Sequence, residues 1–141
     1  MMTSKNKLMG SNQSNVQPIL VIESDNDARP LLIENLTRQG FQLMVALSEI
    51  DALPQLRGAS QLPAIILMNQ VNRTVEETLS KGQQLRQDAD LSPQVPIVIM
   101  ADRYGADLEG TIVQVGERDY IIYQEDAQQL FDLLIRLYNC L

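Results

Sequence analysis

The sequence predicts an α/β fold in which five parallel strands form a central sheet with helices on both faces. Short apolar runs alternate along the chain with segments that repeat apolar residues at helical spacing. The runs are apolar throughout, which is typical of parallel strands buried on both faces. The length of 141 residues, with 45% hydrophobic and 21% charged residues, fits one globular domain with a proper core.

The chain is predicted to divide into a flexible tail and one folded domain. Residues 1–16 are rich in Ser, Asn, Lys and Met and show no periodicity, so we expect an N-terminal tail there. Residues 17–141 contain no internal repeat and no linker-like segment. We therefore expect a single domain over 17–141.

The strands are predicted where the apolar runs lie, and each is followed by a helical segment. The predicted strands cover residues 18–23, 41–47, 64–69, 96–101 and 119–123. The predicted helices cover residues 27–39, 49–58, 74–87, 106–115 and 127–141.

Local signals support the ends of several helices. The polar residues "SDND" precede the first helix and are suited to capping it, with Asp25 and Asp27 near its positive end. Pro30 falls in the first turn, where a missing N–H costs little, and Gly40 is a suitable stop. Gly116 is expected to end the fourth helix in the same way.

The last helix has the clearest pattern. One apolar stripe at i, i+3, i+4 and i+7 spacing is expected to pack on the sheet. Its members are Ala127, Leu130, Phe131, Leu134, Leu137, Tyr138 and Leu141. Leu133 and Ile135 are expected to lie to the sides of this stripe.

Functional residues are expected at the carboxyl ends of the central strands. We expect right-handed crossovers between the parallel strands and the flavodoxin-like strand order 2-1-3-4-5, in which functional sites collect at these ends. The residues predicted there are Glu23, Ser24, Asn69, Ala101 and Tyr123.

The order and spacing of five segments carry a family resemblance. "ILVIESDNDARPLL" covers the first strand, the acidic cluster and the first helix, and "LPAIILMN", "VPIVIMAD" and "GERDYIIYQ" cover the third, fourth and fifth strands. Over residues 18–141 the chain resembles the receiver domain of bacterial two-component response regulators. The resemblance implies a flavodoxin-like (βα)5 three-layer sandwich.

The resemblance also implies a site that has lost its chemistry. In that family two adjacent acids bind Mg²⁺, a strand-3 aspartate accepts the phosphoryl group, and a hydroxyl and a lysine hold its oxygens. The matching positions here hold Glu23–Ser24, Asn69, Ala101 and Tyr123, with Gln124 after the last. An amide cannot form an acyl phosphate. We therefore expect a degenerate phosphoacceptor pocket, that is, a pseudo-receiver.

These departures do not depend on the alignment. No aspartate lies between Asp51 and Asp88, and the only lysine outside the tail is Lys81, in the third predicted helix. Asn69 could be a relic, or its amide could fix the surrounding loops; the sequence leaves both interpretations open. Glu23, Asp25 and Asp27 form an acidic cluster after the first strand. We interpret Asp25 and Asp27 as helix-starting residues rather than as part of a metal site, because Mg²⁺ normally also needs substrate oxygens.

Composition narrows the class of function. A formal net charge of −7 disfavours binding to nucleic acid or to anionic membranes. The chain has no histidine and a single cysteine, Cys140, so it lacks the residues of imidazole-based zinc sites and of His-assisted nucleophilic catalysis. We expect a cytoplasmic protein that is not an enzyme and needs no metal or cofactor.

Two alternatives to a binding module remain open at this point. One is a phosphorelay regulator that uses an unusual acidic acceptor, Glu23 or Asp25. The other is a flavodoxin-like domain that binds a small ligand such as a nucleotide, although no glycine-rich loop follows the first strand and "ESDNDA" would repel phosphates.

Partners are expected to bind the domain's own surface, since the sequence ends after the fifth predicted helix without an output domain. By family analogy, we expect a signalling protein or a second copy to bind the face formed by helix 4, strand 5 and helix 5. Its apolar residues would be Ile112, Val113, Leu133 and Ile135, with Arg118, Asp119, Asp132 and Arg136 at the rim. Tyr120 occupies the position of the family's switch aromatic and is expected to be a fixed core or interface residue.

Overall fold

The central sheet has the strand order β2-β1-β3-β4-β6-β5 in the computed structural model, which describes residues 16–140. The strands are β1 (Ile19–Ile22), β2 (Leu43–Ala46), β3 (Ile65–Asn69), β4 (Ile97–Met100), β5 (Thr111–Gln114) and β6 (Asp119–Tyr123). The helices are α1 (Arg29–Arg38), α2 (Glu49–Arg57), α3 (Val75–Asp88) and α4 (Ala127–Tyr138).

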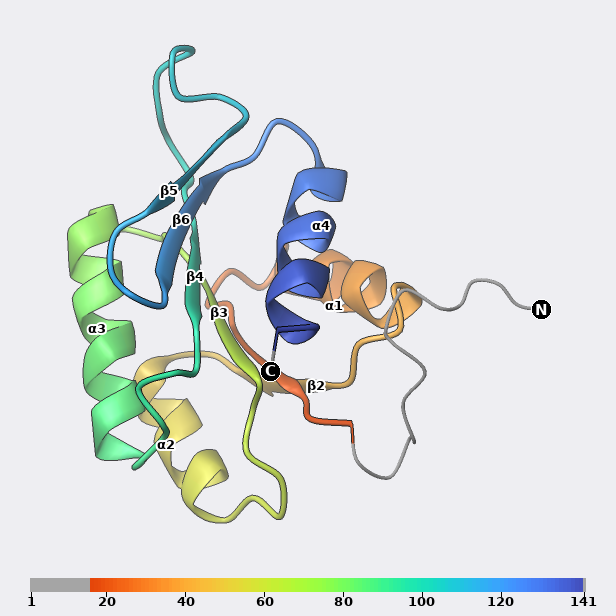
Figure 1. Cartoon of the computed structure of the whole chain (residues 1–141), viewed down its shortest axis with the longest axis vertical. Helices are drawn as coiled ribbons and strands as arrows, with labels where there is room; N and C mark the ends of the chain where they lie inside the picture. The colour runs from red at the N-terminus through yellow and green to blue at the C-terminus, as the bar shows by residue number, and fades with distance from the viewer. Residues whose placement is uncertain (1–15, 141) are drawn as a thin grey trace.

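The sheet is the middle of three layers, with α1 and α4 on one face and α2 and α3 on the other (Figure 1). Alternate residues of each central strand serve the two faces: Ile19 and Val21 join the core beneath α1 and α4, whereas Leu20 and Ile22 join the core beneath α2 and α3. The predicted fold class is confirmed, including the parallel order of the first four strands and β6.

The predicted ends of the first helix are partly confirmed. Pro30 lies in the first turn, and Gly40 follows the last turn with φ of 100°, a conformation that glycine adopts without strain. The predicted side-chain cap is wrong, because the N-cap residue is Ala28 and its side chain cannot accept a hydrogen bond. Instead, the Asp25 carboxylate accepts the Asp27 N–H at 2.9 Å and closes the preceding turn.

The predicted helix over 106–115 is wrong. Residues 106–110 form a turn, after which the chain becomes β5 and pairs antiparallel with β6. Gly110, with φ of 85°, separates the two, and its N–H donates to the Tyr123 carbonyl at 2.6 Å. The β-branched run from Thr111 to Val113 favours the extended strand over a helix.

The apolar arc of α4 is wider than predicted. Leu130, Phe131, Leu134 and Leu137 are buried as expected and Tyr138 is partly buried, whereas Ala127 is exposed and Leu141 lies outside the described residues. Leu133 is only 1% exposed and belongs to the same core. Leu133 is three residues after Leu130 and four before Leu137, which places it on their face of the helix. Ile135 is partly buried against this core. Neither Leu133 nor Ile135 therefore forms an exposed patch.

The start of the described chain packs against the folded domain. The predicted tail lies outside the described residues except for Val16, which is 2% exposed and hence part of the domain. The Tyr138 hydroxyl of α4 donates to the Gln17 carbonyl at 3.0 Å. Burial raises the pKa of this phenol, and the bond to Gln17 opposes the rise.

None of the helices in residues 16–140 is long and apolar enough to cross a membrane.

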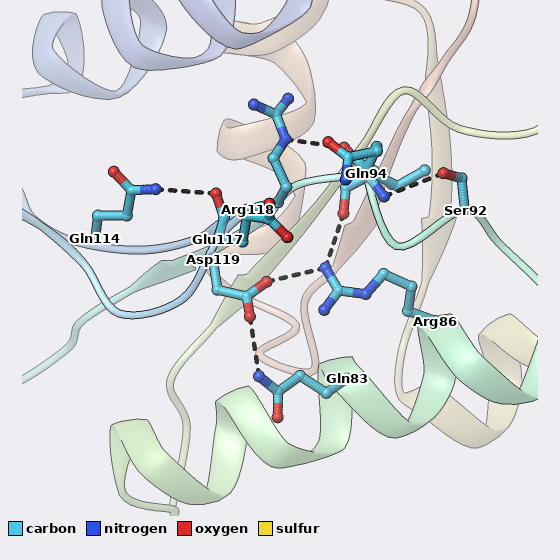
Figure 2. A network of polar contacts seen from close by, with 9 residues as sticks. Gln83, Arg86, Ser92, Gln94, Gln114, Glu117, Arg118 and Asp119 are labelled. Carbon is cyan, nitrogen blue, oxygen red and sulfur yellow. Dashed lines mark hydrogen bonds and ion pairs between the residues drawn. The ribbon is translucent and has the colours of Figure 1, made fainter.

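A buried ion pair joins β6 to α3. Figure 2 shows the Asp119 carboxylate between Gln83 Nε2 and Arg86 Nη1, each 2.9 Å away. Arg86 Nη1 also donates to the Val95 carbonyl at 2.9 Å, so one guanidinium holds the starts of both β4 and β6. Asp119 is only 4% exposed, so its predicted role as a rim charge is wrong.

We expect Asp119→Ala to lower the free energy of unfolding by ~3 kcal/mol, because it leaves the Arg86 charge buried without its partner. Asp132→Ala is the matched control. Asp132 is exposed and accepts only from Gln128 within α4, so its loss should change stability by less than about 0.5 kcal/mol. Urea unfolding followed by circular dichroism measures both. Equal stability of the two variants would contradict the structural role given to Asp119.

Candidate functional site

The carboxyl ends of β1 and β3 bring Glu23 and Asn69 into contact. The two strands are neighbours in the sheet, and each carries its polar residue at the point where the apolar run ends. Asn69 Nδ2 donates to Glu23 Oε1 at 2.8 Å. The predicted acceptor position is therefore occupied by an amide that is already hydrogen-bonded to the neighbouring carboxylate.

Glu23 is a buried carboxylate that is held by neutral donors. It is 1% exposed, and its second oxygen accepts the Asp25 N–H at 3.2 Å. The nearby Arg29 guanidinium donates to the Glu23 backbone carbonyl at 3.0 Å. Among the described residues, no lysine or arginine nitrogen lies within 4.0 Å of the Glu23 carboxylate. The carboxylate thus depends on amide hydrogen bonds in place of a cation.

The positions of the family's hydroxyl and lysine carry an apolar and an aromatic group. Ala101 follows β4, is 8% exposed and offers only a methyl group. The Tyr123 ring packs edge-on against Tyr104, with 5.3 Å between ring centroids. The Tyr104 hydroxyl donates to the Gln124 carbonyl at 2.6 Å. Two tyrosines therefore join the loop after β4 to the end of β6.

Gln70, which the sequence analysis did not single out, connects two loops at this edge. Its Nε2 donates to the Arg73 carbonyl at 2.8 Å, and its Oε1 accepts the Asp102 N–H at 2.9 Å. Arg73 in turn pairs with Glu49 of α2 through two contacts of 3.2 and 3.1 Å. Gln70 directly follows Asn69, and this position was a usable sequence signal for its role. A side-chain amide at the end of a strand often forms hydrogen bonds with the adjoining loops.

The predicted site residues are only partly assembled into one pocket. Glu23, Asn69 and Ala101 line one cavity together. Ser24 is exposed and lines a second cavity, which shares Asn69 with the first. Tyr123 packs against the core beneath α2 and α3.

The predicted switch aromatic and the predicted output residues lie away from this pocket. Tyr120 is partly buried against the core beneath α4. Ile112 and Val113 are each 39% exposed, on the edge strand β5.

The groups at the predicted acceptor, hydroxyl and lysine positions are an amide, a methyl group and a phenol. The Asn69 amide is not a nucleophile toward phosphorus, and the Ala101 methyl group cannot donate a hydrogen bond to a phosphoryl oxygen. Lys81 lies on α3 and is exposed. Within the described chain, no group of three or more His, Cys, Asp or Glu residues is placed to hold a metal ion.

Comparison with solved structures places this architecture among receiver domains. One similar structure is described as a transiently phosphorylated "switch" in bacterial signal transduction; it has a TM-score of 0.59 and 21% identity, over 88% of this chain and 95% of the other. A response regulator receiver protein from Sinorhizobium medicae WSM419 gives a TM-score of 0.64 at 18% identity, over 89% and 97% of the two chains.

A third similar structure is the N-terminal domain of a response regulator/sensory box/GGDEF protein from Carboxydothermus hydrogenoformans, with a TM-score of 0.55 and 20% identity over 88% and 98% of the two chains. Neither the family models nor the curated proteins give a match to this chain. The similarity therefore shows that the chain has the fold of response regulator receiver domains.

We expect Asn69→Asp to lower the free energy of unfolding by about 2 kcal/mol, because it replaces the donor to Glu23 by a second carboxylate. Adding Glu23→Gln to this variant should restore most of the loss, since the new amide can donate to the new carboxylate. Urea unfolding of wild type, both single variants and the double variant measures this exchange. Purely additive effects of the two substitutions would show that the hydrogen bond has no role in stability.

Proposed function

We propose that this protein is a pseudo-receiver: a signalling domain that binds a protein partner without being phosphorylated. The receiver fold supports a role in signal transduction. The main support for function without phosphorylation is the Asn69–Glu23 hydrogen bond, which occupies the predicted acceptor position with a polar pair. The domain has one fixed arrangement of loops, and its output does not depend on a phosphoryl group.

Side-chain contacts support the fixed arrangement of the loops. In a phosphorylated receiver, the phosphoryl group would draw the loops after strands 3 and 4 together. Here Gln70 already joins these loops, and Tyr104 joins the loop after β4 to Gln124. Each is a neutral hydrogen bond between groups of the chain itself. The loops are therefore held without a ligand that another protein must add or remove.

The two alternative functions receive less support from the geometry. Glu23 is hydrogen-bonded through both carboxylate oxygens, and no lysine or arginine of the described chain lines the cavity beside it to hold the transferred oxygens of a phosphodonor. Asp25 is exposed, and the only lysine among residues 16–140, Lys81, lies on α3. A nucleotide would bring its phosphates next to Glu23, Asp25 and Asp27, which would repel them.

The output surface is proposed at the open edge of β5 rather than on a helix. β5 is the last strand of the sheet, and Val115 N–H bonds to the Asp119 carbonyl at 2.8 Å. Because pairing in antiparallel ladders alternates, the N–H and C=O groups of Ile112 and Gln114 point away from β6. The strand carries no charge or proline that would block pairing with another strand.

Exposed apolar side chains make this edge a contact surface. Ile112, Val113 and Val115 are 39%, 39% and 43% exposed. At the opposite edge, Gln55 Nε2 covers the Val45 carbonyl of β2 at 3.1 Å. The two edges therefore differ: β2 has a side-chain cover on its backbone, whereas β5 presents apolar side chains and backbone groups together.

The charges at either end of β5 indicate the kind of partner. Asp107 and Glu109 precede the strand, Glu117 follows it, and all three are exposed. Antiparallel pairing of β5 with a second copy would set Glu109 close to the other copy's Glu117, which is unfavourable. An extended segment of another protein, apolar at its centre and basic at its ends, fits this edge better than a second copy does.

We expect no phosphorylation by acetyl phosphate or phosphoramidate with Mg²⁺, because the nucleophile and the groups that stabilise the transferred oxygens are absent. Asn69→Asp alone should also remain unlabelled. Intact-mass spectrometry measures the mass gain, with a receiver domain that retains all five groups as the positive control. Labelling of wild type that disappears on changing Glu23 or Asp25 would favour the phosphorelay alternative. Labelling of Asn69→Asp would show that only the nucleophile had been lost.

We expect an extended peptide of alternating valine and threonine, with lysines at both ends, to bind at the β5 edge. An NMR titration with this peptide should shift the amide resonances of Ile112 and Gln114. The glutamate-flanked version should bind more weakly, because of the acidic residues around β5. Ile112→Lys should abolish the shifts. Ile50→Lys is the matched control, because Ile50 is 87% exposed on α2 and away from the edge.

Light scattering of the same proteins separates a partner from a second copy. We expect a monomer for wild type and for both variants. A wild-type dimer that Ile112→Lys dissociates and Ile50→Lys does not would replace the partner protein by a second copy of this chain. Peptide shifts confined to residues outside β5 would overturn the proposed edge.

A further inference from the structure

A cavity between α1 and α4 opens beside the Glu23–Asn69 pair, and the function proposed above makes no use of it. Its volume is about 400 Å³, within the ~300–1,000 Å³ typical of small-molecule sites. Leu31 and Leu32 of α1 form part of its wall, and Leu130 and Phe131 of α4 another. The cavity is thus large enough for a small organic molecule and has apolar walls from two helices.

The charge of the lining is one-sided. Glu23 and Asp102 bring carboxylates to the cavity, and no lysine or arginine lines it. Glu23 is almost wholly buried, and within residues 16–140 its carboxylate receives hydrogen bonds only from the Asn69 amide and the Asp25 N–H. A carboxylate has about four acceptor positions, so the Glu23 group can accept further donors. A group that brings positive charge as well would offset the cost of burying it.

A second acceptor in the lining has no partner. Gln124 lines the cavity, and its Oε1 is buried without a hydrogen-bond partner in the described structure. A buried acceptor left unpaired costs free energy, and it commonly marks a place where a bound group completes the bonding. Glu23 and Gln124 thus have the same requirement, which is a ligand that donates hydrogen bonds.

The apolar side of the cavity also has an exposed member. Leu31 is 61% exposed although it lines the cavity, whereas Leu130 and Phe131 are buried, with exposed fractions of 2% and 7%. Covering Leu31 with an apolar group of a ligand would remove this surface from water. The cavity therefore combines an apolar wall that can be covered further with two acceptor side chains, Glu23 and Gln124. The amides of Asn35 and Asn69 and the Tyr104 hydroxyl also belong to its lining.

We propose that this cavity binds a small organic cation: a primary amine that carries a compact apolar group. The ammonium would donate to the Glu23 carboxylate and to Gln124 Oε1, and the apolar group would lie between α1 and α4. The net charge of −7 favours the approach of a cation. Binding is reversible and involves no covalent step, and the proposal does not rest on the β5 edge or on the lack of phosphorylation.

The test is isothermal calorimetry of the full chain with 2-phenylethylamine. Three probes isolate the parts of the proposal: 2-phenylethanol lacks the charge, 3-phenylpropionate reverses it, and ethylamine lacks the apolar group. We expect saturable binding of 2-phenylethylamine and binding at least ~10-fold weaker for each of the other three, since a charge-assisted hydrogen bond and a buried ring each contribute about that factor. Equal affinity for the amine and the alcohol, or no saturable binding of the amine, would overturn the proposal.

Variants locate the site. Glu23→Gln keeps the shape of the side chain and should weaken binding of 2-phenylethylamine at least ~10-fold. Glu125→Gln is the matched control, because Glu125 is exposed, neighbours Gln124 and does not line the cavity, so affinity should not change. Ala127→Met carries the test if Glu23→Gln fails to fold: Ala127 is exposed and lines the cavity, and a longer side chain there should block entry. Unchanged affinity in the folded Glu23→Gln or Ala127→Met variant would overturn the proposal.

Discussion

The structure depends on the burial of β1, β3 and β4 between two layers of helices. Each residue from Ile19 to Ile22, Ile65 to Met68 and Ile97 to Met100 is at most 6% exposed. Backbone groups buried in this way must pair with neighbouring strands, and side chains on both faces must be apolar. Polar side chains are therefore confined to the strand ends. This constraint, rather than any contact between loops, is what brings Glu23 and Asn69 together.

The same constraint explains how the receiver fold accommodates neutral side chains at these strand ends. The sheet and its helices need nothing from the groups at the strand ends except that buried polar atoms find partners. Asn69 satisfies Glu23, Gln70 joins the loops after β3 and β4, and Tyr104 bonds to Gln124. Neutral hydrogen bonds between groups of the chain thus hold this edge of the sheet together. The fold itself does not require any one chemistry at these positions.

The sequence predicts the fold well because each buried strand appears as a continuous apolar run, and the ends of these runs also locate the strand ends. The helix over 106–115 was mispredicted because a short segment between Gly105 and Gly116 gives too few residues for a period to be distinguished from the β-branched run at 111–113. Leu133 was misplaced because two stripes of α4 satisfy the same spacing. The role of the Asn69 amide was left undecided, and the hydrogen bond from the Tyr104 hydroxyl to the Gln124 backbone carbonyl was not predicted. Hydrogen bonds between strand ends depend on distances that the periodicity of a sequence does not encode.

The packing of Tyr104 against Tyr123 has an optical consequence. The sequence has no tryptophan and four tyrosines, so its near-ultraviolet absorption and emission come mainly from tyrosine. Two of these rings lie 5.3 Å apart at the end of β6, and Tyr104 also lines the cavity between α1 and α4. Rings held in one orientation by their neighbours give near-ultraviolet circular dichroism, which is lost when the packing loosens. The chain thus carries an intrinsic spectroscopic reporter at the edge of the sheet where its loops meet, and their order can be followed without an added label.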